Sequence, residues 1–162
     1  MKAIQHTLTA IFLLALVAMS PVAFSHCEVP CGIYNDPLRC DLIAEHITTI
    51  EKAMMQIKDL STQKTINYNQ LVRWITTKDE HADKIQEIVS QYFLTQRIKS
   101  VDEQNKAEYA SYISKLRLLH EMLILAMKTK QTTDLANIDQ LRLALTRFKE
   151  AYFGSIEIKH EH

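Results

Sequence analysis

The residues of this 162-residue chain that are best suited to carry chemistry lie in the stretch HCEVPCGIY, residues 26–34. It contains two of the chain's three cysteines, Cys27 and Cys31, and a histidine, His26. Thiolates and an imidazole are ligands for transition metals, so this spacing predicts a metal site. Two cysteines of an exported protein also form disulfides, and on these residues alone a disulfide is the alternative.

The segment before this stretch predicts export. Lys2 is the only charged residue in residues 1–25, and the apolar run that follows it is too short to span a bilayer. Residues 23–25 (Ala-Phe-Ser) are typical of the site that a signal peptidase cleaves. We therefore expect residues 1–25 to be a secretory signal, cleaved between Ser25 and His26, and the mature chain to be periplasmic or extracellular.

Cleavage before His26 would create a further metal ligand, the free α-amino group. The amine, the backbone nitrogen of Cys27 and the Cys27 thiolate would close two adjoining five-membered chelate rings, which favours a planar arrangement. The Cys31 thiolate would complete a plane of two nitrogens and two sulfurs. Such a plane suits Ni(II) or Cu(II), whereas zinc prefers a tetrahedron. The His26 imidazole would remain free to bind axially.

Three other residues of the stretch fit a loop that folds around one ion. Pro30 lies between the cysteines and can reverse the chain, especially with a cis peptide bond. Gly32 permits a backbone conformation that leads out of the loop. Tyr34 would place a phenol near the open face of the metal, where it could donate a hydrogen bond to a small oxyanion.

Residues 26–34 resemble the nickel hook of the nickel superoxide dismutases, with the pattern HCxxPCGxY. The segments YNDP (residues 34–37) and QYF (residues 91–93) are also similar to the helix entry and a later aromatic segment of that family. The resemblance implies an enzyme that converts superoxide to O₂ and H₂O₂. It further implies one nickel per subunit, cycling between Ni(II) and Ni(III), in a hexamer of four-helix bundles.

The resemblance also implies roles for single residues of the hook. It makes His26 (amine and imidazole), Cys27 (amide and thiolate) and Cys31 (thiolate) the nickel ligands. It further implies that Pro30 is cis and that Tyr34 gates the substrate.

Three more residues have candidate supporting roles in this resemblance. Glu28 stands in the hook where the family can have another acidic or polar residue. His81 stands where the family has an arginine that reaches the hook of a neighbouring subunit. Glu45 is a candidate to support His26 from the first helix.

The rest of the chain predicts an all-α fold. Two glycines and three prolines leave few turn signals, and apolar residues recur every three or four positions. Asn35-Asp36-Pro37 predicts a helix start, with the Asp36 carboxylate accepting from free amides. Further helices are expected over about 67–98, from about 105 to 129, and from about 132 to a stop at Gly154. These four helices predict an antiparallel bundle over residues 35–154, followed by a tail, residues 155–162.

The sequence leaves two features of these helices undecided. The residues Thr77-Lys78-Asp79-Glu80 resemble a capping box, so the second helical region is either one helix or two. The third cysteine, Cys40, has no assigned partner and is interpreted as a small, half-buried hydrophobic residue of the first helix. His46, His81 and His120 are interpreted as structural histidines, held by hydrogen bonds.

Composition narrows the possible functions. The formal net charge is zero, which argues against nucleic acid as a partner, and no stable membrane anchor is expected. Two alternatives to the enzyme remain: an exported nickel- or copper-binding protein without catalysis, and a helical interaction module stapled by a disulfide. Superoxide removal by the nickel-loaded protein distinguishes all three.

Overall fold

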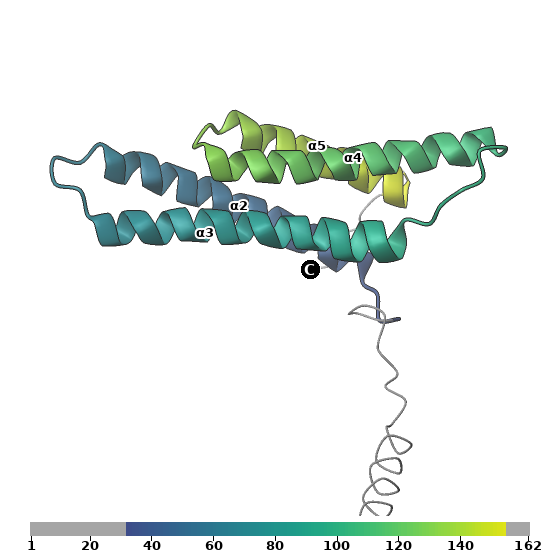
Figure 1. Cartoon of the computed structure of the whole chain (residues 1–162), viewed down its shortest axis with the longest axis horizontal. Helices are drawn as coiled ribbons and strands as arrows, with labels where there is room; N and C mark the ends of the chain where they lie inside the picture. The colour runs from purple at the N-terminus through teal and green to yellow at the C-terminus, as the bar shows by residue number, and fades with distance from the viewer. Residues whose placement is uncertain (1–31, 155–162) are drawn as a thin grey trace, which may run out of the picture. The chain divides into compact units, whose positions relative to one another are not determined.

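The computed structural model describes residues 32–154, and all of its regular elements there are helical (Figure 1). They are α2 (Asp36–Ser61), α3 (Tyr68–Glu87), η1 (Ile88–Arg97), α4 (Lys106–Gln131) and α5 (Ala136–Phe153). Helix α2 packs on α3 and α5, and α4 packs on α3 and α5, so the four long helices close into a bundle. The predicted all-α four-helix bundle is confirmed.

Each helix presents an apolar stripe to one shared core. Helix α2 contributes residues at the three- and four-residue spacing that the sequence predicted, and the aromatic ring of Phe93 meets that of Phe148 near one end of the core. Cys40 is fully buried in this core and has a free thiol. Burial raises the pKa of this thiol to about 12, so Cys40 is a core residue more deeply buried than expected.

The second helical region is continuous. Residues 77–80 lie inside α3, so the predicted capping box does not start a new helix. Lys78 is buried there, and its ammonium donates to the backbone carbonyls of Thr129 (2.7 Å) and Lys130 (2.7 Å) and to Asp79 Oδ1 (2.8 Å). The last carbonyls of a helix have no partner within it, so Lys78 satisfies two orphan acceptors at the end of α4.

The helix continues from α3 into η1 with a change of hydrogen bonding. Residues 88–97 form a π-helix, and the backbone N–H of Ile98 donates to the carbonyl of Phe93, five residues earlier. Thr95 and Gln96 also donate side-chain hydrogen bonds to carbonyls five residues earlier. π-Helical turns are rare and frequently lie at functional sites.

The helix ends bring separate segments together. The start of α2, the end of η1, the start of α4 and the end of α5 lie at the same end of the bundle (Figure 1). Gly154 ends α5 with a φ of 76°, in the left-handed region that favours glycine, and confirms the predicted stop. Residues 32–154 contain no helix with both the length and the apolar character needed to cross a membrane.

Some large apolar residues of the helices are exposed. Ile75 on α3 and Ile113 on α4 are both exposed. The buried face of α4 is formed by residues in its second half: Leu118, Leu119, Met122, Leu125, Ala126 and Thr129.

Candidate metal centre and substrate gate

Tyr34 is the first residue of the predicted site that can be examined in detail. The residue is 42% exposed, and it precedes Asn35, the N-cap of α2. The Arg97 guanidinium carbon lies 4.3 Å from the centroid of the Tyr34 ring, and the Tyr92 ring meets it edge to face at 5.9 Å. A cation over an aromatic face and an edge-to-face ring pair are both attractive contacts. Tyr34 is thus held by its ring, and within residues 32–154 its hydroxyl has no hydrogen-bond partner.

Two residues after Tyr34, the carboxylate of Asp36 collects hydrogen bonds from three side chains. Arg97 donates from Nε to Oδ1 (2.9 Å) and from Nη2 to Oδ2 (2.7 Å), and Tyr152 donates its hydroxyl to Oδ2 (2.8 Å). The hydroxyl of Tyr92 donates to Oδ1. We call these four residues (Asp36, Tyr92, Arg97 and Tyr152) the Asp36 cluster. It joins α2, η1 and α5.

This arrangement corrects the role expected for Asp36. The N-cap of α2 is Asn35, whose side chain accepts from the backbone N–H of Leu38 (3.1 Å). Asp36 occupies the first turn, but its carboxylate accepts hydrogen bonds from the other cluster residues instead of capping the helix. The Asn35 side chain takes the capping role because it sits one residue earlier, where the backbone is not yet helical. The backbone N–H of Asn35 also donates to the Tyr92 hydroxyl oxygen (3.0 Å).

The cluster shifts the pKa values of its members. Burial alone would raise the pKa of Asp36, but the hydrogen bonds from Arg97, Tyr92 and Tyr152 outweigh it and hold that pKa below its usual value. Burial and then the Asp36 carboxylate raise the pKa of both Tyr92 and Tyr152 to about 12. The hydrogen bonds to Asp36 also raise the pKa of Arg97. At neutral pH the cluster therefore holds one carboxylate, one guanidinium and two neutral phenols.

The π-helical η1 explains how Tyr92 and Arg97 reach the same carboxylate. In an α-helix, residues five apart are rotated by about 140° from one another. Hydrogen bonds to the fifth preceding residue place more residues in each turn, so this rotation becomes smaller. Tyr92 and Arg97 are five residues apart in η1, and both contact Asp36. The local helix geometry is thus what aligns the cluster.

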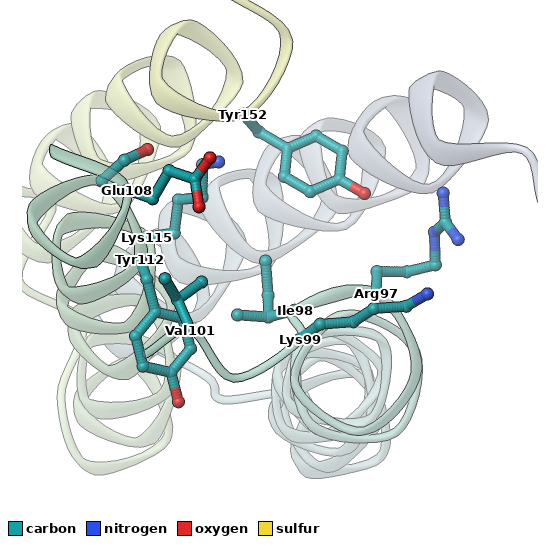
Figure 2. Close-up of a pocket in the computed structure, with 9 residues that line it drawn as sticks. Arg97, Ile98, Lys99, Val101, Glu108, Tyr112, Lys115 and Tyr152 are labelled. Carbon is teal, nitrogen blue, oxygen red and sulfur yellow. The ribbon is translucent and has the colours of Figure 1, made fainter. Parts of the chain in front are cut away.

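A small cavity adjoins the cluster. It has a volume of about 210 Å³ and lies between the connection from η1 to α4 and helices α4 and α5. Figure 2 shows Arg97 and Tyr152 in its wall, together with Lys99, Lys115 and Glu108. Arg97, Lys99 and Lys115 are cationic and Glu108 is anionic, so the charged residues that line the cavity have a net positive charge. It shares two side chains with the cluster, and it was not predicted from the sequence.

The proposed metal ligands lie outside the described residues. These are His26, Cys27 and Cys31, and the hook residues Glu28 and Pro30 lie outside them too. Gly32 is described and has a φ of 77°, in the left-handed region that favours glycine. Within residues 32–154 no group of three or more histidine, cysteine or acidic side chains could hold a metal ion.

The two remaining candidates, Glu45 and His81, lie near each other on α2 and α3. His81 contacts His46, with 3.1 Å between the two Nδ1 atoms, and Glu45 is the exposed neighbour of His46 in the chain. The prediction that His46 and His81 are hydrogen-bonded structural histidines is confirmed. His120 is exposed on α4, away from any such partner within residues 32–154.

A four-helix bundle whose sequence carries two cysteines and a histidine just before its first helix has the features of a small helical metalloprotein. The sequence matches the family described as nickel-containing superoxide dismutase over residues 21–155, most of the chain. The chain belongs to this family. It is therefore an oxidoreductase that acts on superoxide with nickel as cofactor. Neither the comparison with curated proteins nor that with solved structures found a match.

Sequence reasoning missed two members of the cluster. It singled out Asp36 through the helix start and Tyr92 through the QYF segment, but gave neither residue a role in the site. Arg97 and Tyr152 had no signal, because a cation at the end of one helix and a tyrosine near the end of another are ordinary surface and core residues. Only their distance to Asp36 identifies them.

Proposed function

We propose that this superoxide dismutase holds its nickel at an N-terminus created by cleavage between Ser25 and His26. The amine and imidazole of His26, the amide nitrogen and thiolate of Cys27, and the Cys31 thiolate would be the ligands. The matched range of the family includes all three residues. This donor set fits nickel, because thiolates and an anionic amide are strong electron donors. Nickel bound in this way supplies a one-electron couple between Ni(II) and Ni(III).

The observation that supports the proposal most directly is the set of contacts that hold the ring of Tyr34. Tyr34 follows Cys31 by three residues and is held through its ring by Arg97 and Tyr92, and no other group among residues 32–154 hydrogen-bonds its hydroxyl. We assign to this hydroxyl the positioning of the superoxide anion and the delivery of a proton to the peroxide product. The Asp36 cluster acts as the support of the gate, because Tyr92 and Arg97 each contact both Tyr34 and Asp36.

Roles for the other hook residues belong to the same proposal. Pro30, as a cis residue, and Gly32 would shape the loop between the second thiolate and Tyr34. Glu28 would lie near the metal, and Glu45 would support the His26 imidazole. A ligating histidine generally donates its second ring N–H to a neighbouring acceptor, which is the support that the Glu45 carboxylate would supply.

Export and assembly complete the proposal. The small residues before His26 and the preceding apolar run support a cleaved signal and a periplasmic or extracellular enzyme. A homo-oligomer, by resemblance a hexamer, is supported by apolar side chains that the bundle leaves exposed. Ile33 is 81% exposed beside Tyr34, and Tyr68 and Val72 are exposed on one face of α3.

The test uses two variants that separate the hook from the gate. One extra residue before His26 replaces the amine ligand by an amide, so nickel retention, the low-energy thiolate-to-nickel optical bands and activity should be lost together. Tyr34→Phe keeps the ring that Arg97 and Tyr92 contact but removes the hydroxyl. We expect full nickel content and helicity, with lower turnover and altered binding of small anions such as azide.

Pulse radiolysis measures the kinetics of superoxide removal by both variants, and nickel analysis measures their metal content. Full activity in the extended protein would contradict the assignment of the amine ligand. Unchanged kinetics and azide binding in Tyr34→Phe would reduce Tyr34 to a packing residue. Loss of nickel from Tyr34→Phe would instead make it part of the metal scaffold.

A further inference from the structure

Two histidines from neighbouring helices meet at the α2–α3 interface. His46 on α2 and His81 on α3 place their Nδ1 atoms 3.1 Å apart, and their rings cross at 83° with centroids 4.9 Å apart. Both side chains are partly buried, so the pair lies at the edge of the interface rather than in the core. Helices α2 and α3 are long, adjacent and packed along their length, so the two imidazoles are held on a rigid support.

The separation of the two nitrogens matches that of two ligands on one metal ion. Zn–N bonds in proteins are about 2.0–2.1 Å, so two nitrogens at right-angled to tetrahedral positions lie about 2.8–3.4 Å apart. The observed 3.1 Å falls within this range. We propose that His46 and His81 form a second metal site, which binds one divalent transition-metal ion such as Zn(II) through both Nδ1 atoms.

The protonation of the pair suits metal binding. A metal binds the neutral imidazole, so a low proton affinity favours it. Burial, His81 and Lys84 lower the pKa of His46, against an opposing effect of Glu45. Burial and Lys84 likewise lower the pKa of His81, against Glu80 and Glu45. Without metal, one ring must carry its proton on Nδ1 to bond the other; with metal, both carry it on Nε2.

The charges around the pair are compatible with a cation. Two carboxylates, Glu45 and Glu80, and one ammonium, Lys84, act on the two rings. Their sum is one negative charge, which a divalent ion would offset. Because the pair supplies two protein ligands, water would complete the coordination, and the site would be weaker and more open than a four-ligand structural zinc site.

This second site differs in chemistry from the nickel site. It offers two imidazoles and no thiolate or amide nitrogen, so it has no donor that stabilises a trivalent metal. We therefore assign it no redox function. A metal bound there would join α2 to α3 and stabilise the folded bundle, because it binds the native arrangement of both helices.

The experiment measures Zn(II) binding by the nickel-loaded protein, which separates its outcome from that of the hook assignment. All proteins carry His160→Ala and His162→Ala, which removes the histidines of the C-terminal tail as competing ligands. Equilibrium dialysis against Zn(II) should then show one zinc per chain. His46→Gln and His81→Gln should each weaken this binding about tenfold or more, and the double variant no more than the single ones. His120→Gln, which alters an exposed histidine on α4, is the matched control.

Two further measurements identify the ligand atoms and the effect on the fold. Zn(II) should shift the ¹⁵N resonances of the Nδ1 atoms of both histidines, and it should raise the melting temperature of the parent protein but not of the pair variants. Zinc bound equally well by His46→Gln or His81→Gln would overturn the proposal. So would the absence of zinc binding at millimolar concentration, or ligation through Nε2.

Discussion

Two charged groups of the bundle are satisfied in different ways, the partly buried Asp36 carboxylate and the buried Lys78 ammonium. Each collects several hydrogen bonds, and each connects helices that are distant in the sequence. Asp36 is bonded to side chains from η1 and α5, whereas Lys78 is bonded mainly to backbone carbonyls at the end of α4. A buried charge needs such partners, because leaving it unpaired is costly in free energy.

The difference in partners separates function from stability. The partners of Lys78 are the Asp79 carboxylate and the last carbonyls of α4, and none of the contacts described for residues 32–154 joins them to Tyr34. Two partners of Asp36, Tyr92 and Arg97, also hold the ring of Tyr34. A change at Asp36 is therefore expected to reach Tyr34, the proposed gate, while a change at Lys78 should stay within the bundle. Measurements of stability and activity on the two sites can break or sharpen this distinction.

The largest effect is expected for Asp36→Ala. It leaves the Arg97 guanidinium and two phenols without their acceptor and frees Arg97 to leave the Tyr34 ring. We expect a loss of about 2–4 kcal/mol in the free energy of unfolding, because a partly buried pair is broken. Activity per bound nickel should fall about tenfold or more, since a displaced gate no longer orients the substrate. Urea unfolding and pulse radiolysis measure the two.

Asp41→Ala is the control for this change. Asp41 is an exposed carboxylate on the same helix, 3.4 Å from Lys149 Nζ. Its removal should alter stability by less than about 1 kcal/mol and leave activity per nickel unchanged. If Asp36→Ala were as active and as stable as Asp41→Ala, the Asp36 cluster would have no part in the gate.

Much of this fold could be predicted from periodicity. Ile43, Ile47 and Ile50 recur at helical spacing and are all buried, because one-dimensional spacing suffices to define the core face of a helix. The stop at Gly154 was predictable for a similar reason, since few residues other than glycine adopt its φ. Local rules of this kind decide helix existence and helix ends.

Other features depend on distances that a sequence pattern does not contain. Lys78 reads as part of a helix start, but it is buried because the end of α4, about fifty residues later, offers it two carbonyls. The π-helical hydrogen bonding of η1 has no sequence signature in IVSQYFLTQR, although it aligns Tyr92 with Arg97. His46 and His81 were each predictable as structural histidines, but not as partners of one another.

A smaller effect is expected for Lys78→Met, which keeps the length of the side chain and removes its ammonium. The carbonyls of Thr129 and Lys130 lose a buried donor, so the free energy of unfolding should fall by about 1–3 kcal/mol. Activity per bound nickel should not change. Lys128→Met, which changes an exposed lysine in the last turn of α4, should cost less than about 0.5 kcal/mol. A loss of activity per nickel in Lys78→Met would show that Lys78 and Asp36 are coupled.

The smallest effect is a difference in acid sensitivity between the wild-type protein and Asp36→Asn. The pKa of Asp36 is lower in the folded protein than in the unfolded chain, where it is about 3.9. Below that pH the unfolded chain therefore binds more protons than the folded one. The contribution of Asp36 to stability is complete above about pH 4 and is lost as the pH falls through the folded pKa. The amide of Asp36→Asn does not titrate, so it lacks this loss.

The stability gap between wild type and Asp36→Asn should accordingly be constant near neutral pH and become narrower below about pH 4. His46 and His81, whose pKa values are lowered by burial, also destabilise the fold in acid, but they are present in both proteins and cancel in the difference. The gap between wild type and Lys78→Met should lack the narrowing that Asp36 causes, because both of these proteins keep the Asp36 carboxylate. Urea unfolding at a series of acidic pH values measures both gaps. A gap for Asp36→Asn that does not narrow would mean that the Asp36 carboxylate is not held in its charged form by the cluster.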